Sequence, residues 1–312
     1  MTANSARLTG VLSPVVTPFD SDLRPDAGRL ARHCEWLISN DVGLAVFGTN
    51  SEANSLSTKE KMSLLEHLVE AGLPSQRMMP GTGCCALSDS IELTKRAVQL
   101  GCGGVLMLPP FYYKGVSDEG LYRNYAAIID AVGDSRLRIY LYHIPPVAQV
   151  PISLALIERL LKDFPGTIAG VKDSSGDWAN TNAMLKQFQP EGFDVFAGSE
   201  SFLLATLRGG GAGCISATAN VNPAAIARLA DTWNNSDADD QQTALIKTRE
   251  VFQDYVMIPA LKAAIAQYSG DDTWNHLRPP LVELTPEQRK TLAAALKANG
   301  FDMPGLHAAA EV

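Results

Sequence analysis

A lysine at the end of an apolar strand is the residue of this sequence best suited to covalent chemistry. Residues 167–171 are β-branched or small and carry no charge, which predicts a short buried strand leading to Lys172. An ammonium ion is poorly solvated in such a place, so burial favours the neutral amine. A neutral amine is a nucleophile that forms a Schiff base with a ketone or an aldehyde. The competing interpretation is a strand-end lysine that reaches into solvent and has no chemical role.

Polar side chains also follow other predicted strands, where parallel α/β barrels build their active sites. Tyr142 ends the strand next to that of Lys172, about 4.8 Å away in backbone terms, so its phenol could pass protons to an atom bound to the lysine nitrogen. Thr49 follows the second strand and could relay that proton or, with the next backbone amides, hold a carboxylate. Tyr113 suits either packing or the relay. His143 is a candidate for substrate binding, although a rim histidine with its own partners is the commoner case.

The elements that would position these residues alternate regularly along the chain. Strands are expected at residues 11–17, 43–48, 77–81, 104–108, 138–142, 167–171, 193–197 and 213–217. Helices are expected at residues 25–39, from 57 onward, and at 88–100, 118–132, 152–164, 178–188, 201–208 and 223–233. Eight such units in roughly 230 residues predict an α/β fold, a (β/α)8 TIM barrel. We expect the barrel to span residues 1–233, with a C-terminal helical appendage at 234–312 packed on it.

Composition narrows the functional classes. The 312 residues are 46% hydrophobic and 19% charged, with a net charge of −8 and no basic face or run of like charge, so we expect no nucleic-acid partner. The first residues lack an apolar signal core and no apolar run is long enough to span a bilayer, which predicts a cytoplasmic protein without a membrane partner. Five scattered cysteines form no CxxC pair, and Asp173 and Asp177 lack a histidine cluster, so neither a disulfide framework nor a metal site is expected.

Short motifs in a defined order resemble the dihydrodipicolinate synthase / N-acetylneuraminate lyase family. They are Gly48-Thr49-x-x-Glu52, Tyr142-x-Ile144-Pro145, Gly170-Val171-Lys172-Asp173, the run from Gly213 to Asn220, and the closing run from Leu277 to Leu281. The resemblance covers nearly the whole chain. It implies class I, Schiff-base aldolases and related lyases on a TIM barrel, acting on pyruvate or another 2-keto acid and an aldehyde. It also implies a homotetramer or a dimer.

The same resemblance implies roles for individual residues. Lys172 would form the imine with the keto acid, so no separate cofactor is expected. Tyr142 would be the proton shuttle, oriented by Thr49, and Tyr113 would be the relay tyrosine that tetramers can lend to a neighbouring subunit. The substrate-binding residues would be Gly48, Asn50, which holds the carboxylate with Thr49, and Ile215, which lines the pyruvate pocket.

Two departures from the family pattern concern the second substrate. The usual Gly-Thr-Thr-Gly-Glu is Gly-Thr-Asn-Ser-Glu at residues 48–52, and residues 145–149 lack the arginine that holds the aldehyde partner's carboxylate. A pocket lined by Phe111, Val147 and Ala148 favours a less charged or more apolar partner than aspartate semialdehyde. Aldolases or dehydratases of 2-keto-3-deoxy sugar acids and aromatic hydratase-aldolases remain open. From other classes, so do a metal-dependent aldolase and a non-catalytic 2-keto-acid-binding barrel.

Overall fold

The computed structural model describes residues 7–306, which form two compact units. The first comprises residues 7–10 and 74–215, and the second comprises residues 11–73 and 216–306. This grouping does not coincide with the predicted division into residues 1–233 and 234–312, because the first strand–helix segments of the chain group with the C-terminal helices. That division stays a prediction about domains.

A parallel sheet forms the centre of the first unit, with the strand order β3-β4-β5-β6-β7. Its strands are β3 (Val105–Met107), β4 (Ile139–His143), β5 (Ile168–Asp173), β6 (Asp194–Ala197) and β7 (Gly213–Ile215). Nearly every residue of these strands is buried, as apolar runs in parallel sheets require. Five of the predicted strands are thus confirmed.

The strand predicted at residues 77–81 is reduced to one isolated parallel bridge, between Gly81 and Leu106. The Leu106 amide donates to the Pro80 carbonyl at 2.9 Å, and the Thr82 amide donates to the Leu106 carbonyl at 3.0 Å. Pro80 has no amide hydrogen of its own, so it cannot extend a regular ladder. The extended segment is therefore present, but too little of it pairs to count as a strand.

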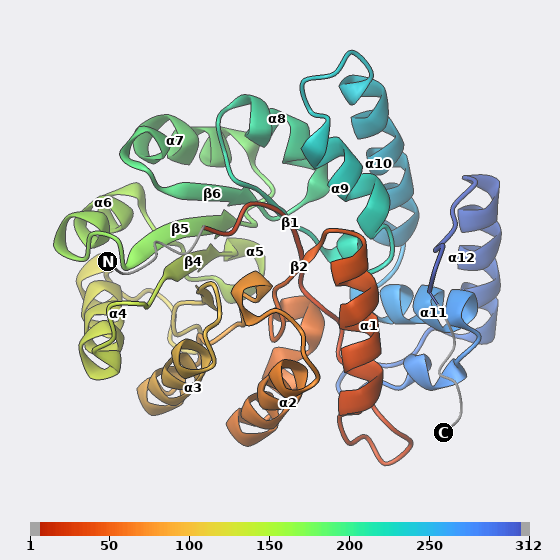
Figure 1. Ribbon diagram of the computed structural model, residues 1–312, viewed down its shortest axis with the longest axis horizontal. Helices are drawn as coiled ribbons and strands as arrows, with labels where there is room; N and C mark the ends of the chain where they lie inside the picture. The colour runs from red at the N-terminus through yellow and green to blue at the C-terminus, as the bar shows by residue number, and fades with distance from the viewer. Residues whose placement is uncertain (1–6, 307–312) are drawn as a thin grey trace. The chain divides into compact units, whose positions relative to one another are not determined.

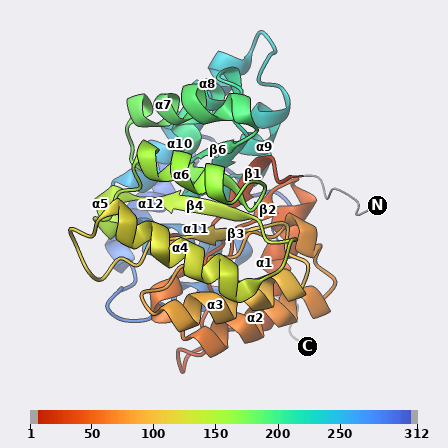
Figure 2. The same ribbon diagram turned by 90° about the vertical axis from the view of Figure 1, so that its left-hand side faces the viewer.

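Helices alternate with the strands of the first unit as predicted. They are α3 (Leu87–Gln99), α4 (Asp118–Val132), α5 (Pro145–Ala148), α6 (Leu154–Asp163), α7 (Trp178–Phe188) and α8 (Leu203–Arg208). The predictions for α4 and α7 match at both ends, and the four-residue α5 was not predicted. In Figure 2, α4 and α6 lie in front of β4, so they cover one face of the sheet.

The second unit contains β2 (Gly43–Leu44) and all but the first residue of β1 (Gly10–Ser13), and these two short strands are parallel, with Leu12 opposite Gly43. Both stop earlier than predicted. Pro14 follows β1 directly and cannot donate to a ladder. After β2, Phe47 adopts a left-handed backbone conformation with φ of 62°, so the chain turns before the predicted strand end.

The helices of the second unit are α1 (Ala27–Ser39), α2 (Thr58–Glu70), α9 (Pro223–Asp231), α10 (Ala238–Gln253), α11 (Met257–Ser269) and α12 (Pro286–Ala298). The capping box predicted at Ser57 and Glu60 is confirmed at the start of α2. Helices α11 and α12 pack side by side, as Figure 1 shows. None of the described helices combines the length and the apolar character needed to cross a bilayer.

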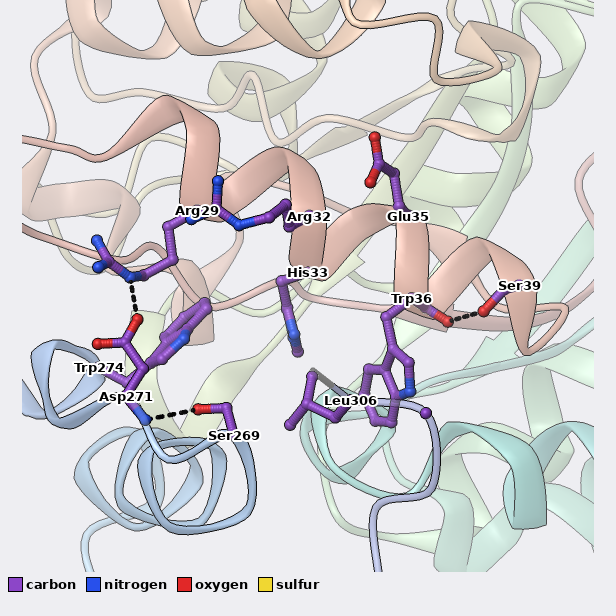
Figure 3. A pocket seen from close by; sticks show the side chains of 11 residues that line it. Arg29, Arg32, His33, Glu35, Trp36, Ser39, Ser269, Asp271, Trp274 and Leu306 are labelled. Carbon is purple, nitrogen blue, oxygen red and sulfur yellow. Dashed lines mark hydrogen bonds and ion pairs between the residues drawn. The ribbon is translucent and has the colours of Figure 1, made fainter. Parts of the chain in front are cut away.

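A cavity of about 330 Å³ lies between α1 and the segment that follows α11 (Figure 3). At its rim, Arg29 donates from Nε to the Asp271 carboxylate at 2.6 Å. The His33 ring packs between two indoles, with ring centroids 5.6 Å from Trp36 and 5.2 Å from Trp274. Burial lowers the pKa of His33 to about 4, so this imidazole is neutral at physiological pH.

Candidate active site

Lys172 and Tyr142 lie side by side in the first unit. They are directly paired in the register of β5 and β4, and the Lys172 Nζ lies 3.3 Å from the Tyr142 hydroxyl oxygen. The two residues are only 2% and 3% exposed. Among residues 7–306, no carboxylate lies within ion-pairing distance of this amine. A buried amine whose hydrogen-bond partner is a phenol can act as a nucleophile with a proton donor beside it.

Gly170 leaves room for the Tyr140 ring and for the backbone of Asp194 beside it. Gly170 is two residues before Lys172 and so shares its face of β5. A Cβ atom on Gly170 would lie 2.3 Å from the Asp194 carbonyl oxygen and 2.8 Å from the Tyr140 ring. The Tyr140 hydroxyl donates to the Asp194 carboxylate at 3.1 Å, and Arg7 forms an ion pair with Asp194 at 3.3 Å. Burial raises the pKa of both Tyr140 and Asp194. Gly170, Tyr140 and Asp194 are therefore a buried and closely packed group next to Lys172 and Tyr142.

His143 and Asp173 follow Tyr142 and Lys172 by one residue, and the two-residue period of a strand turns them to the opposite face. The Asp173 carboxylate accepts hydrogen bonds from the Ser175 amide at 2.9 Å and the Thr181 hydroxyl at 2.6 Å, which holds the start of α7. The His143 Nδ1 accepts from the Ile152 amide at 3.0 Å, and burial lowers the pKa of this imidazole. The structure therefore gives His143 a role in holding the approach to α6, and its role in substrate binding stays a prediction.

Thr49 and Asn50 lie in a compact loop of the second unit, here called the Thr49 loop (residues 48–56). It consists of two single-turn 3-10 helices, η1 (Thr49–Ser51) and η2 (Ala53–Ser55), joined at Glu52. The Gly48 amide donates to the Ser51 hydroxyl at 3.1 Å, and the Thr17 hydroxyl donates to the Ser51 carbonyl at 2.7 Å. The Ser51 amide donates to the Gly48 carbonyl at 3.1 Å and the Glu52 amide donates to the Thr49 carbonyl at 3.3 Å, so the loop is closed by its own hydrogen bonds.

The remaining predicted residues differ in exposure. Ile215 is fully buried at the end of β7. Tyr113 is 73% exposed in the single chain, and its ring packs edge-on against Tyr112 with centroids 5.2 Å apart. Val147 on α5 is also exposed, whereas Ala148 is buried. Tyr113 and Val147 are therefore available to molecules outside this chain.

Within residues 7–306, no group of three or more histidine, cysteine, aspartate or glutamate side chains is placed to hold a metal ion. All five cysteines are free thiols.

A sequence profile of the dihydrodipicolinate synthetase family matches residues 7–299. This chain belongs to that family. It is 34% identical over 289 residues to an uncharacterized DapA-like lyase of Chloroflexus aurantiacus, covering 92% of this chain and 95% of the relative.

Two solved structures show the same likeness. Dihydrodipicolinate synthase from Agrobacterium tumefaciens is 30% identical with a TM-score of 0.86, over 93% of this chain and 99% of that one. YagE from E. coli K12, solved in complex with pyruvate, is 27% identical with a TM-score of 0.86, over 95% of this chain and all of that one. These findings confirm the predicted (β/α)8 TIM barrel with a C-terminal helical part. They also confirm an enzyme of the class I lyase type.

In this family member, sequence reasoning missed two lysines. The Lys114 ammonium donates to the Ala148 carbonyl at 2.7 Å and to the Phe111 carbonyl, so it brings a positive charge beside residues 145–149. Lys262 on α11 is fully buried and pairs with Glu52 of the Thr49 loop. Spacing could not reveal the contact of Lys114 with Ala148 or that of Lys262 with Glu52, because these partners lie 34 and 210 residues away in the sequence.

Proposed function

We propose that this protein is a cytoplasmic Schiff-base lyase that condenses pyruvate or a related 2-keto acid with an aldehyde, or cleaves the corresponding aldol. Lys172 forms the imine and Tyr142 moves the protons. The observation that carries the proposal is the buried Lys172 amine 3.3 Å from the Tyr142 hydroxyl, in a chain of the dihydrodipicolinate synthetase family. The imine is made from the protein's own lysine, so no separate cofactor is required.

The chemistry follows from this pair. The neutral Lys172 nitrogen attacks the keto carbon, and the Tyr142 hydroxyl supplies a proton to the developing oxygen anion. Loss of water leaves an iminium, which draws electrons and acidifies the adjacent methyl group. The Tyr142 oxygen, which has given its proton to the departing water, accepts a methyl proton and so leaves an enamine. The enamine carbon attacks the aldehyde carbon, and the same proton passes to the aldehyde oxygen as the iminium re-forms. Water then hydrolyses the iminium, releasing the product and restoring the amine. In reverse, the same steps cleave an aldol.

The Thr49 loop suits the carboxylate of the keto acid. Thr49 and Asn50 are half-buried, and their backbone amides lie at the start of η1. We assign Gly48, Thr49 and Asn50 to carboxylate binding, and Ile215 to the wall of the keto-acid pocket, by the family pattern. Amide donors of this kind cost no reorganisation when the anion binds.

Trapping with borohydride tests the imine. Wild-type protein incubated with pyruvate and borohydride should carry one reduced pyruvate-derived adduct, on Lys172, by peptide mass spectrometry. Lys172→Ala should carry none. Lys186→Ala is the matched control, since Lys186 is an exposed lysine on α7 of the same unit, and it should be labelled like wild type. An unlabelled wild type, or an adduct on another lysine, would overturn the proposal.

The second substrate is proposed to be less charged than aspartate semialdehyde. The exposed Val147 side chain and the missing arginine at residues 145–149 support this, while Lys114 is the cation held beside them. With pyruvate fixed, a co-substrate screen should show faster carbon–carbon bond formation with apolar or sugar-derived aldehydes than with aspartate semialdehyde. The reverse order would assign the protein to dipicolinate synthesis.

A homotetramer or dimer, with Tyr113 contributed to a neighbouring subunit's site, is proposed from the 73% exposure of Tyr113 in the single chain. Intersubunit complementation tests this. Tyr113→Phe and Lys172→Met proteins, each with low activity, should regain part of the wild-type activity when refolded together, because mixed assemblies contain sites with both native residues. No recovery in assemblies shown to be mixed would place Tyr113 outside the shared site.

A further inference from the structure

The Thr49 loop is tied to the C-terminal helical region by a buried ion pair. The Lys262 ammonium on α11 lies 2.5 Å from the Glu52 carboxylate, and both side chains are fully buried. The same ammonium donates to the His276 carbonyl at 2.9 Å and lies 4.5 Å from the centre of the Phe19 ring. Helix α11 also packs directly against η1.

Arg278 makes a second connection to the same loop. Its backbone amide donates to the other Glu52 carboxylate oxygen at 3.2 Å. Its guanidinium donates to the Ser55 carbonyl at 2.6 Å, to the Leu23 carbonyl at 2.9 Å and to the Glu60 carboxylate at 2.6 Å. The hydrogen bonds from Arg278 lower the pKa of Glu60 to about 2, so this pair stays ionised. Arg278 and Lys262 thus hold the loop at Glu52 and Ser55, and Arg278 also holds the first turn of α2 at Glu60.

Stability alone does not account for this arrangement. Moving two ions out of water costs more than most buried pairs return, and well-packed apolar side chains of similar volume often serve stability as well or better. Glu52 also adopts a left-handed conformation, with φ of 55°, which side chains other than glycine seldom adopt. The loop that carries Thr49 therefore holds both a strained residue and a buried charge. Such features cluster where a backbone must keep one conformation for function.

We propose that Lys262 is a positioning residue that acts through Glu52 to hold the Thr49 loop in the conformation that receives the keto-acid carboxylate. This inference rests on the proposed function for the role of Thr49. It assigns a function to Glu52, the last residue of the motif at residues 48–52, and to the run from Leu277 to Leu281. Imine formation and proton transfer use neither of them. Lys262 touches no reacting atom in this proposal.

The test compares the same substitution at two lysines of the second unit. Lys262→Met removes the charge and keeps an unbranched stem, and Lys290→Met makes that change at an exposed site on α12. For Lys262→Met we expect the KM for pyruvate to rise at least about tenfold, the size of one lost charge-assisted hydrogen bond, with kcat within about threefold of wild type. Lys290→Met should match wild type, and Lys262→Arg should recover part of the KM. A KM unchanged in Lys262→Met would overturn the inference.

Hydrogen exchange supplies a readout that does not depend on turnover. The Ser51 amide bonds to the Gly48 carbonyl at 3.1 Å, and the Ser55 amide bonds to the Glu52 carbonyl at 2.8 Å. These amides should exchange at least about tenfold faster in Lys262→Met, while amides of α7 keep their rates. If Lys262→Met fails to fold, Glu52→Gln, which keeps the shape and removes the charge, takes its place in both measurements. Unchanged exchange of the loop would overturn the inference, whereas failure of Lys172 labelling in wild type would overturn the proposed function instead.

Discussion

Two lysines of this protein are buried to a similar degree but have different partners. Lys172 on β5 is 2% exposed, and its amine has the Tyr142 hydroxyl as its hydrogen-bond partner. Lys262 on α11 is fully buried, and its ammonium is held by the Glu52 carboxylate and the His276 carbonyl. A carboxylate stabilises the charged form of a lysine, whereas a phenol leaves the nitrogen available for reaction. If Lys172 is the nucleophile proposed above, its partner, and not burial alone, separates it from the structural cation Lys262.

The burial of each lysine has a different consequence for stability. Removal of the Lys172 amine leaves no opposite charge behind, since no carboxylate among residues 7–306 pairs with it. Removal of the Lys262 ammonium leaves the Glu52 carboxylate buried without its counter-ion. Burial lowers the pKa of Lys262 to about 8, and Glu52 opposes that shift. The same substitution at the two positions should therefore separate catalysis from stability.

Lys172→Met should produce the largest loss of activity. We expect the rate of carbon–carbon bond formation to fall by at least about 10³-fold, because the covalent intermediate cannot form. The free energy of unfolding should stay within about 1 kcal/mol of wild type or rise, since a buried amine is replaced by an apolar group of similar length. Urea denaturation and steady-state assays on one preparation measure both. A large loss of stability would show that Lys172, like Lys262, is a structural cation.

Tyr142→Phe removes the proton donor while leaving the amine in place. The expected result is a fall in kcat of about 10²–10⁴-fold, the usual contribution of a positioned acid or base. Borohydride should still trap pyruvate on Lys172, but more slowly than in wild type. A variant with wild-type kcat would mean that a group other than the Tyr142 hydroxyl moves the proton, and the contrast between the two lysines would then lose its chemical basis.

Lys262→Met should lower the free energy of unfolding by about 3–5 kcal/mol, the usual effect of removing one member of a buried ion pair. The double variant Glu52→Gln/Lys262→Met should recover part of that loss, because it leaves no unpaired charge. Urea denaturation of the two variants and of Lys290→Met measures the effect. A single variant within about 1 kcal/mol of wild type would show that water reaches Glu52, so that the two lysines differ less than their burial indicates.

His33 extends the comparison to a base that folding keeps neutral. Its pKa is about 4 in the folded chain and 6.5 when unperturbed, so between these values the unfolded chain binds more protons. The free energy of unfolding should therefore fall as the pH drops from 6.5 to 4, by about 3 kcal/mol from this group, and change little further below pH 4. His33→Phe, which keeps a ring between the two tryptophans, should flatten that fall, and His67→Gln should not. An equal slope in all three proteins would contradict the low pKa.

Much of the fold could be predicted because the responsible signals are local. Apolar runs separated by amphipathic stretches predicted the alternation of strands and helices, and α4 and α7 begin and end where their periodicity does. The placement of Tyr142 beside Lys172 also followed, because neighbouring parallel strands bring their carboxyl ends to one edge. Two strand boundaries were predicted wrongly, because a local feature acts there only through the pairing with neighbouring strands. Pro80 limits one ladder, and the turn at Phe47 shortens another strand.

The sequence by itself determined the family and the strand–helix order and led to the prediction that Lys172 is the amine that reacts, because each depends on residues close together or on motifs in a fixed order. The tertiary structure alone decided which buried lysine is paired. Lys262 lies in an apolar, alanine-rich helix and meets Glu52 across 210 residues, so no spacing could predict the contact. Ion pairs form where the folded chain brings opposite charges together. The attraction between the two charges becomes strong only after the surrounding side chains have packed and excluded water.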